Sequence, residues 1–206
     1  MAAYALKPRF RAALKPIETR VTSWGVSADT VTAAGLVASG LAAASIVAAA
    51  WQPLFLAAVA PLVILRLACN AIDGMIAQDK GTSSAWGFVL NECADRAADV
   101  LILAAVIAYT HATTLGVAAV GLVLLASYMG IVGCAVGGSR QYAGIMGKAD
   151  RMLLLAVFAF AQMLWTSCPI LHVFLATITV GAAITVPQRL LATHRQLAPG
   201  SGEGKA

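Results

Sequence analysis

The chain has 206 residues, of which 60% are hydrophobic and only 11% are charged, and its formal net charge is +5. Soluble globular domains are about 45–50% apolar and about 25% charged, so this composition excludes an ordinary soluble protein and indicates an integral membrane protein. We expect residues 1–198 to form a single membrane domain, a Gly-rich disordered tail at 199–206, and no nucleic-acid partner.

The N-terminal segment is basic and amphipathic. The apolar residues Phe10, Leu14, Ile17, Val21 and Trp24 recur at helical spacing in this segment. Five Lys and Arg side chains lie among them. This pattern predicts an amphipathic helix that lies in the membrane interface. A solvated basic tail is the alternative.

Six apolar runs follow, at 30–50, 53–77, 84–110, 113–137, 150–168 and 170–191. Each run is close to the ~20 residues that a helix needs to cross the hydrocarbon core, so we predict an all-α polytopic protein with six transmembrane helices. In the connecting segments, Lys and Arg gather in the N-terminal arm, in the loops at 78–84 and 137–148 and after 188, whereas the other three loops contain neither. The positive-inside rule then places both termini in the cytoplasm, and we expect the bacterial inner membrane.

Polar residues interrupt the second and third apolar runs. Helical periodicity places a stripe on each of these two antiparallel helices, and the stripes can face one another: Asn70 and Asp73 on the second helix, and Asn91, Glu92, Asp95 and Asp99 on the third. Charge is costly inside a bilayer, so such a cluster is interpreted as a functional site. A hard divalent cation relieves the repulsion between close carboxylates by taking their oxygens as ligands. In the alternative, a structural network, Arg66 and Arg96 pair with the acids, but two arginines cannot neutralise four acids.

The spacing of this cluster resembles the signature of the CDP-alcohol phosphotransferases, Asp-x2-Asp-Gly-x2-Ala-Arg-x8-Gly-x3-Asp-x3-Asp across the second and third helices. The chain reads Asn70-x2-Asp73-Gly74-x2-Ala77-Gln78-x8-Gly87-x3-Asn91-x3-Asp95. Every spacing agrees, and five of the eight signature positions are identical. Near the start of the first helix, Thr32 occupies the place of a family threonine.

The resemblance implies a membrane transferase of phospholipid biosynthesis. Such enzymes move a substituted phosphate, usually a phosphatidyl group, from a CDP-linked donor such as CDP-diacylglycerol to an acceptor alcohol and release CMP. Two divalent ions, Mg²⁺ or Mn²⁺, are implied as cofactors. By position, the resemblance implies these roles: Asn70, Asp73, Asn91 and Asp95 as metal ligands; Asp95 also as the general base; Asp73, Gly74, Ala77, Gln78, Gly87 and Thr32 as nucleotide contacts; and Arg140, Lys148, Arg151 and Arg189 as contacts to acceptor or lipid phosphates. The positive-inside pattern explains the last four equally well.

Three positions depart from the signature, because Asn70 and Asn91 replace aspartates and Gln78 replaces an arginine. Fewer ligand charges weaken metal binding. Glu92 and Asp99 lie on the same face of the third helix as Asp95. We expect both to join the metal site and restore its negative charge.

Other interpretations remain open. One is a catalytically weakened relative that binds nucleotide or lipid without turnover, in which Glu92 pairs with Arg96. Another is an ion transporter, which the scarcity of ionisable residues in the other helices disfavours. We also expect a homodimer, because four glycines suit close helix packing, although packing inside one chain explains them as well: Gly116, Gly121, Gly130 and Gly133.

Overall fold

The computed structural model describes residues 7–79, 81 and 84–198, so the expected tail at 199–206 lies outside them. Within the described residues every regular element is a helix. In chain order these are α2 (Lys7–Ser23), α3 (Ala28–Ala48), the short 3₁₀ helix η1 (Pro53–Ala58), α4 (Val59–Asp79), α5 (Ala85–Thr110), α6 (Thr113–Ile131), the 3₁₀ helix η2 (Val132–Val136), α7 (Lys148–Leu164) and α8 (Ile170–Leu197). The expected all-α class is confirmed.

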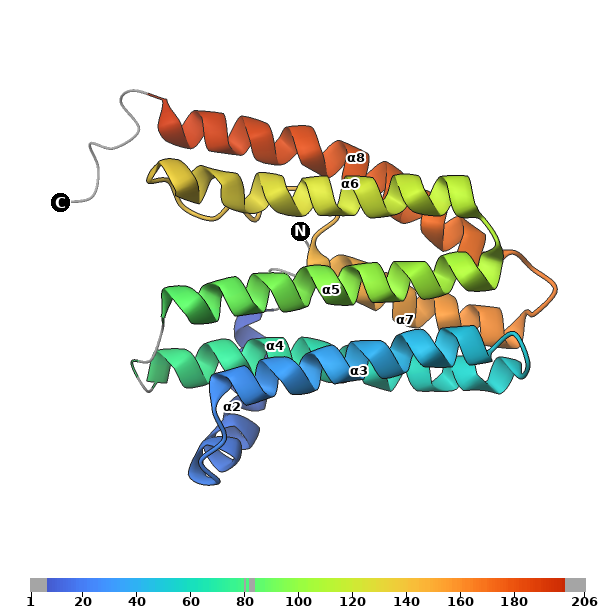
Figure 1. Ribbon diagram of the computed structural model, residues 1–206, viewed down its shortest axis with the longest axis horizontal. Coiled ribbons are helices and arrows are strands. Elements are labelled where there is room, and N and C mark those ends of the chain that lie inside the picture. The colour runs from blue at the N-terminus through green and yellow to red at the C-terminus, as the bar shows by residue number, and fades with distance from the viewer. Residues whose placement is uncertain (1–6, 80, 82–83, 199–206) are drawn as a thin grey trace.

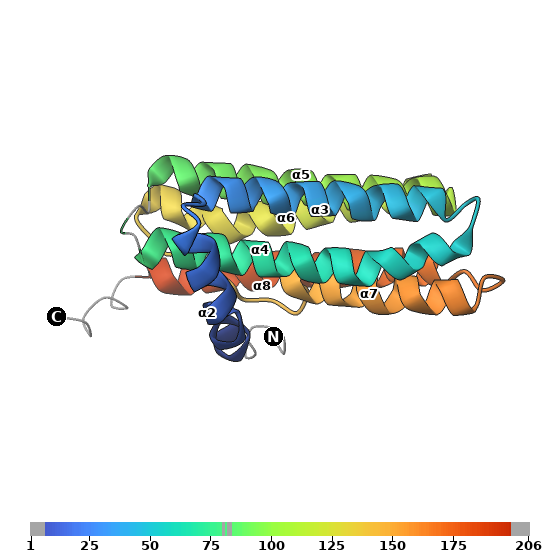
Figure 2. The ribbon, with the colours of Figure 1, turned by 90° about the horizontal axis from the view of Figure 1, so that it is seen from below.

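Helices α3 to α8 run along the long axis of the molecule, and α2 crosses the bundle near one end (Figure 1 and Figure 2). Helix α3 packs against α4 and α5, α4 packs against α7, and α6 packs against α8. Helix α4 finishes and α5 begins at the end that α2 approaches (Figure 1). This end therefore collects the N-terminal segment and the two helices that carry the polar stripes.

Four of the expected spans have the length and composition of membrane-crossing helices: Ala28–Ala48, Pro53–Asp79, Thr113–Val136 and Ile170–Leu197. The chain is therefore an integral membrane protein. The other two expected spans correspond to α5, which carries several charged residues, and to α7, which has only 17 residues. The full set of six spans stays a prediction.

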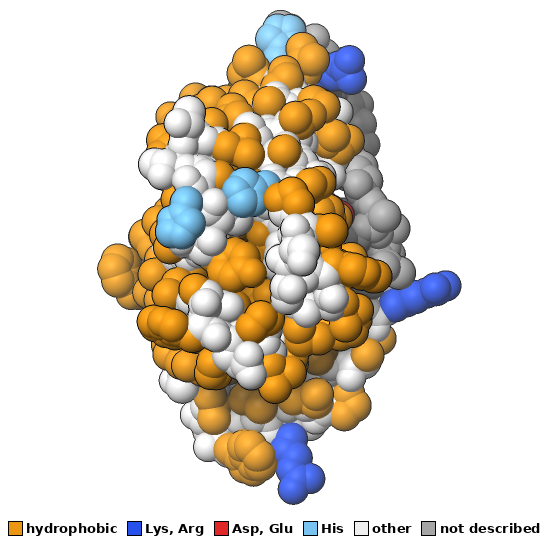
Figure 3. Space-filling model, turned by 90° about the vertical axis from the view of Figure 1, so that its right-hand side faces the viewer, with side chains coloured by type: hydrophobic (Ala, Val, Ile, Leu, Met, Phe, Trp, Pro, Cys, Tyr) orange, Lys and Arg blue, Asp and Glu red, His pale blue; other side chains and the backbone are white. Residues whose placement is uncertain are grey.

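The outer surface of the bundle is apolar. Val37, Val117, Val157 and Val180 each expose more than half of their surface, as expected of side chains that face lipid. The end of the bundle that bears the α3–α4, α5–α6 and α7–α8 connections shows mainly hydrophobic and uncharged side chains, with Lys and Arg only at its edges (Figure 3). This is the end whose connections contain neither Lys nor Arg.

Packing within the chain accounts for most of the glycines that suggested a homodimer. A Cβ added at Gly116 would overlap Ile107, and one added at Gly133 would lie 3.0 Å from Thr193. Gly130 similarly makes room for a buried arginine of α8. A Cβ at Gly121 meets nothing within 4 Å, so the homodimer stays a prediction that these glycines support only weakly.

Candidate functional site

The polar stripes of α4 and α5 meet inside the bundle. The side-chain amide of Asn70 donates to Asn91 Oδ1 at 2.9 Å and to Asp95 Oδ1 at 3.5 Å. Asn91 and Asp95 are four residues apart on α5, so both side chains face the same neighbour on α4. The structure thus brings three of the predicted metal ligands into direct contact.

Asp73, the fourth predicted ligand, is turned toward α3. Its Oδ2 accepts a hydrogen bond from Thr32 Oγ1 at 2.7 Å, and its Oδ1 is buried with no hydrogen-bond partner. The residue is only 3% exposed. A buried carboxylate oxygen without a partner is unfavourable, so Oδ1 marks a place that a cation would stabilise.

Basic side chains from two other parts of the bundle contact Asp95. Its Oδ1 accepts hydrogen bonds from Arg66 of α4 and Lys148 of α7, and Arg96 Nη2 lies 3.9 Å from its Oδ2. Arg66 is fully buried, and Gly35 of α3 makes room for it, since a Cβ at this glycine would lie 2.9 Å from Nη1. The protein itself therefore balances the charge of Asp95.

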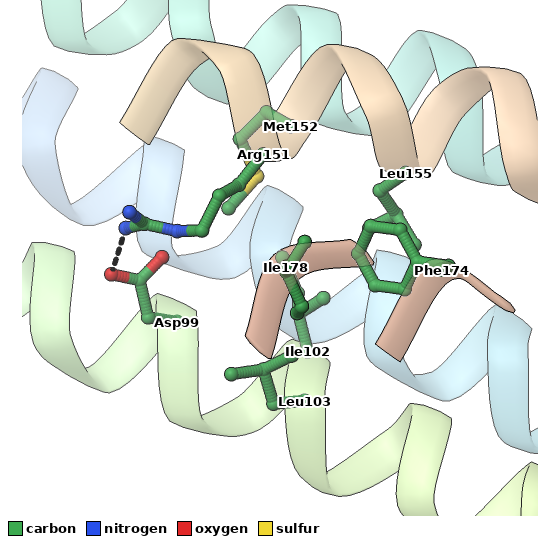
Figure 4. Close-up of a pocket in the computed structure, with 8 residues that line it drawn as sticks. All are labelled: Asp99, Ile102, Leu103, Arg151, Met152, Leu155, Phe174 and Ile178. Atoms are coloured by element: carbon green, nitrogen blue, oxygen red, sulfur yellow. Dashed lines mark hydrogen bonds and ion pairs between the residues drawn. The ribbon is translucent and has the colours of Figure 1, made fainter. Parts of the chain in front are cut away.

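Glu92 and Asp99 each have an arginine partner from the second half of the chain. Arg140, in the α6–α7 connection, pairs with Glu92. Arg151 of α7 donates to Asp99 Oδ2 at 2.7 Å (Figure 4). Arg96 lies 3.8 Å from a carboxylate oxygen of both acids. These contacts favour charge pairing over the expected role of the two acids in the metal site.

Five basic side chains thus surround the three carboxylates of α5, where the sequence argument counted two. The additional three are Arg140, Lys148 and Arg151. The inference that too few basic residues exist to balance the acids is therefore wrong. Lys148 and Arg151 lie 53 and 52 residues from their partners along the chain, so helical spacing could not reveal these pairs.

A cavity of about 560 Å³ opens beside this cluster. Its size falls within the range of about 300–1,000 Å³ that is typical of small-molecule sites. Nine of the predicted site residues line it: Asn70, Gly74, Gln78, Asn91, Asp95, Arg140, Lys148, Arg151 and Arg189. The other predicted residues are not part of its lining: Thr32, Asp73, Ala77, Gly87, Glu92 and Asp99.

A second pocket is lined by the Arg151–Asp99 pair together with apolar side chains that include Ile102, Leu155 and Phe174 (Figure 4). Its volume is about 10 Å³, which is room for one water molecule at most. Of these two, only the larger cavity has room for a small-molecule ligand, so it is the candidate site.

Arg189 reaches this cavity from α8. Its Nη1 and Nε donate to the carbonyl oxygens of Ala126 and Ala143 at 2.6 and 3.0 Å. A Cβ at Gly130 would lie 2.9 Å from Nη1, so this glycine leaves room for the guanidinium. Because carbonyl groups carry no net charge, the guanidinium keeps its ability to attract an anion.

The small residues predicted at the nucleotide site have different surroundings. A Cβ at Gly74 would meet no atom within 4 Å, so the cavity extends to the backbone of α4 there. Gly87 lies in the first turn of α5, where its amide donates to Ser84 Oγ at 2.9 Å. Gly87 thus takes part in the N-terminal cap of α5, a structural role that the sequence argument did not assign.

Helix α2 also contributes to the cavity, through Phe10 and Arg11. Arg11 Nη2 donates to Gln78 Oε1 at 2.6 Å. Neither Phe10 nor Arg11 is among the predicted site residues, because Arg11 lies 67 residues from Gln78 along the chain. The basic amphipathic pattern was the only indication that this segment had a role.

Asn70, Asp73, Asn91 and Asp95 offer oxygen donors of the type that a hard divalent cation prefers. Among residues 7–79, 81 and 84–198, no three His, Cys, Asp or Glu side chains are grouped closely enough to hold a metal ion. A bound ion would therefore need the amide oxygens of Asn70 and Asn91 together with Asp73 and Asp95. All four donors are oxygens, which Mg²⁺ and Mn²⁺ prefer, and Asp73 Oδ1 has no other partner.

Comparison with known proteins identifies relatives of low sequence identity. No family model matches the chain. Among curated proteins it is similar to the inner membrane protein YnbA of Escherichia coli strain K12, with 28% identity over 162 residues, covering 78% of this chain and 80% of YnbA.

Solved structures give a more extensive match, to phosphatidylinositol phosphate synthase PgsA1 of Mycobacterium tuberculosis. The complex of PgsA1 with manganese and citrate matches with a TM-score of 0.74 and 22% identity, over 93% of this chain and 92% of that one. PgsA1 with CDP-DAG bound matches with a TM-score of 0.71 and 23% identity, over 93% and 97% of the two chains. The chain therefore has the membrane-protein fold of phosphatidylinositol phosphate synthase.

Proposed function

We propose that this protein is a transferase that moves a substituted phosphate, most simply a phosphatidyl group, from a CDP-linked lipid to an acceptor alcohol and releases CMP. The observation that carries the proposal is the convergence of Asn70, Asn91 and Asp95 with several cations on one cavity. The cavity lies in a fold that in PgsA1 binds CDP-DAG. The spacing of the signature supports the same activity.

A divalent ion, Mg²⁺ or Mn²⁺, would be held by Asn70, Asp73, Asn91 and Asp95. When bound, it would neutralise charge on the donor phosphates, which is the main requirement of phosphoryl transfer. The PgsA1 structure with manganese supports this choice of metal. Glu92 is proposed as a structural partner of Arg140 rather than as a ligand.

The reaction needs one base and several cations. Asp95 accepts the proton of the acceptor hydroxyl, whose oxygen bonds to the phosphorus of the donor as the phosphorus–oxygen bond to CMP breaks. Lys148 contacts Asp95 and lines the cavity, so it is placed to orient this carboxylate and a phosphate together. Arg140, Arg151 and Arg189 also line the cavity and are proposed to bind phosphates of the acceptor or the lipid. The nucleotide is proposed to lie along Gly74.

The second candidate function is binding of nucleotide or lipid without turnover. The contacts of Glu92 and Asp99 with arginines favour it, because these acids then do not replace the charge that Asn70 and Asn91 lack. In either case we propose six spans in the bacterial inner membrane, with both termini in the cytoplasm. The name of the E. coli relative supports this location.

The test is CMP release by the purified protein from CDP-diacylglycerol with Mg²⁺ or Mn²⁺ and a panel of acceptor alcohols. We expect release that stops on chelation, and Asp95→Asn should slow it by about a hundredfold or more. Asp29→Asn, an exposed aspartate at the start of α3, is the matched control and should keep full activity. CDP-diacylglycerol binding without CMP release would establish the second candidate instead, and the absence of both would refute the two together.

A further inference from the structure

Helix α2 is fixed against the end of α4. Leu14 is buried in a cluster with Ile72 of α4. Lys15 pairs with Asp79 of α4 and, at 3.0 Å, with Glu18 of its own helix. Hydrogen bonds to Asp79 and then to Glu18 raise the pKa of Lys15 above its ordinary value of 10.5. Lys15 therefore helps to hold α2 against the end of α4.

Arg11, one turn before Lys15, has a different kind of partner. Among the described residues it donates a hydrogen bond to Gln78 Oε1, a neutral amide oxygen. A guanidinium has five N–H donors in a rigid planar fork, so donors remain for a ligand. Arg11, Gln78 and the neighbouring ring of Phe10 all line the large cavity.

Gln78 stands at one end of a stripe along α4. Asn70, Gly74 and Gln78 are four residues apart and line the same cavity, so they follow one face of the helix. At about 1.5 Å per residue, the stripe is about 12 Å long. The space beside Gly74 allows a flat ligand to lie along it. A nucleotide with its phosphates near Asn70 and Asp95 therefore has room along this face for its base to reach Gln78 and Arg11.

We propose that Arg11, positioned by Gln78, binds the base of the nucleotide donor and selects cytosine over uracil; this inference rests on the proposed function. Cytosine presents two adjacent acceptors, O2 and N3, and a guanidinium can donate to both at once. Uracil carries a hydrogen on N3, so an N–H of the guanidinium would face an N–H of the base, and no hydrogen bond would form there. The Phe10 ring offers a surface on which either base stacks, so the selection comes from Arg11.

The experiment measures binding of CDP and of UDP to the purified full-length protein with Mg²⁺ by isothermal titration calorimetry. The wild-type protein should prefer CDP by about tenfold or more, the size of one charge-assisted hydrogen bond. Arg11→Gln should abolish most of the preference, and so should Arg11→Lys, which keeps the charge but loses the fork. Exchanging the two side chains in Arg11→Gln/Gln78→Arg should restore part of it. Arg9→Gln is the matched control, because Arg9 is exposed on the same helix and does not line the cavity.

The outcomes separate this inference from the proposed function. An equal loss of CDP and UDP affinity in Arg11→Gln would indicate a phosphate contact and overturn base selection, as would an unchanged preference. Failure of the wild-type protein to bind CDP would overturn both. Selective CDP binding that depends on Arg11, without CMP release, would support base selection and count against a transferase.

Discussion

Asp99→Asn is expected to destabilise the bundle while leaving divalent-metal binding unchanged. The side chains of Asp99 and Arg151 are 2% and 5% exposed, and 2.7 Å separates the paired nitrogen and oxygen. Removing one partner of a buried ion pair costs about 3–5 kcal/mol. Asparagine still accepts one hydrogen bond from Arg151, so we expect the lower end of this range, about 3 kcal/mol.

For a domain of this size, a loss of about 3 kcal/mol lowers the unfolding midpoint by about 6–12 °C. Thermal unfolding of the detergent-solubilised protein measures this change, and electron paramagnetic resonance of free Mn²⁺ measures metal binding. Arg151→Met should destabilise similarly, and the double variant should lose less than the sum, because each single change already breaks the pair. If Asp99→Asn lost Mn²⁺ binding and kept its unfolding midpoint, Asp99 would be a metal ligand and the ion-pair reasoning would be refuted.

Two further predictions concern α3. Gly35→Ala places a Cβ 2.9 Å from Arg66 Nη1 and should cost about 1–3 kcal/mol, whereas Gly40→Ala, with nothing within 4 Å, should be neutral or stabilising by up to about 1 kcal/mol. Equal unfolding midpoints for these two variants would contradict the packing argument. Thr32→Val leaves both oxygens of Asp73 without a hydrogen bond and should cost about 1–3 kcal/mol by the same measurement. Thr32→Ser keeps the hydroxyl and should cost less; an equal loss would show that the threonine methyl matters rather than the hydroxyl.

Much of the fold could be predicted because the length and polarity of an apolar run are local properties. The runs at 30–50 and 113–137 correspond closely to α3 and to α6 with η2. The run at 53–77 was predicted as one helix, but the structure begins it as η1. Proline at its first position has no amide hydrogen and a fixed φ, and such first turns often tighten into a 3₁₀ helix.

The site could be predicted only in part. Residues four apart share a helix face, so the meeting of Asn91 and Asp95 with α4 followed from spacing alone. The basic partners of these acids could not be predicted from spacing. Arg140 and Arg151 are far from the acids of α5 in the sequence and reach them only in the folded bundle. The contribution of Arg11 likewise depends on where α2 docks.

The contacts of Asp95 with Arg66 and Lys148 also bear on how the protein is made. Small zinc domains stay unfolded until their metal arrives, because binding of the ion supplies their free energy of folding. Here basic side chains of the protein already balance the charge of Asp95, so folding of the bundle does not require a bound ion to offset that charge. Under the proposed function, scarcity of magnesium or manganese would then lower activity without unfolding the bundle.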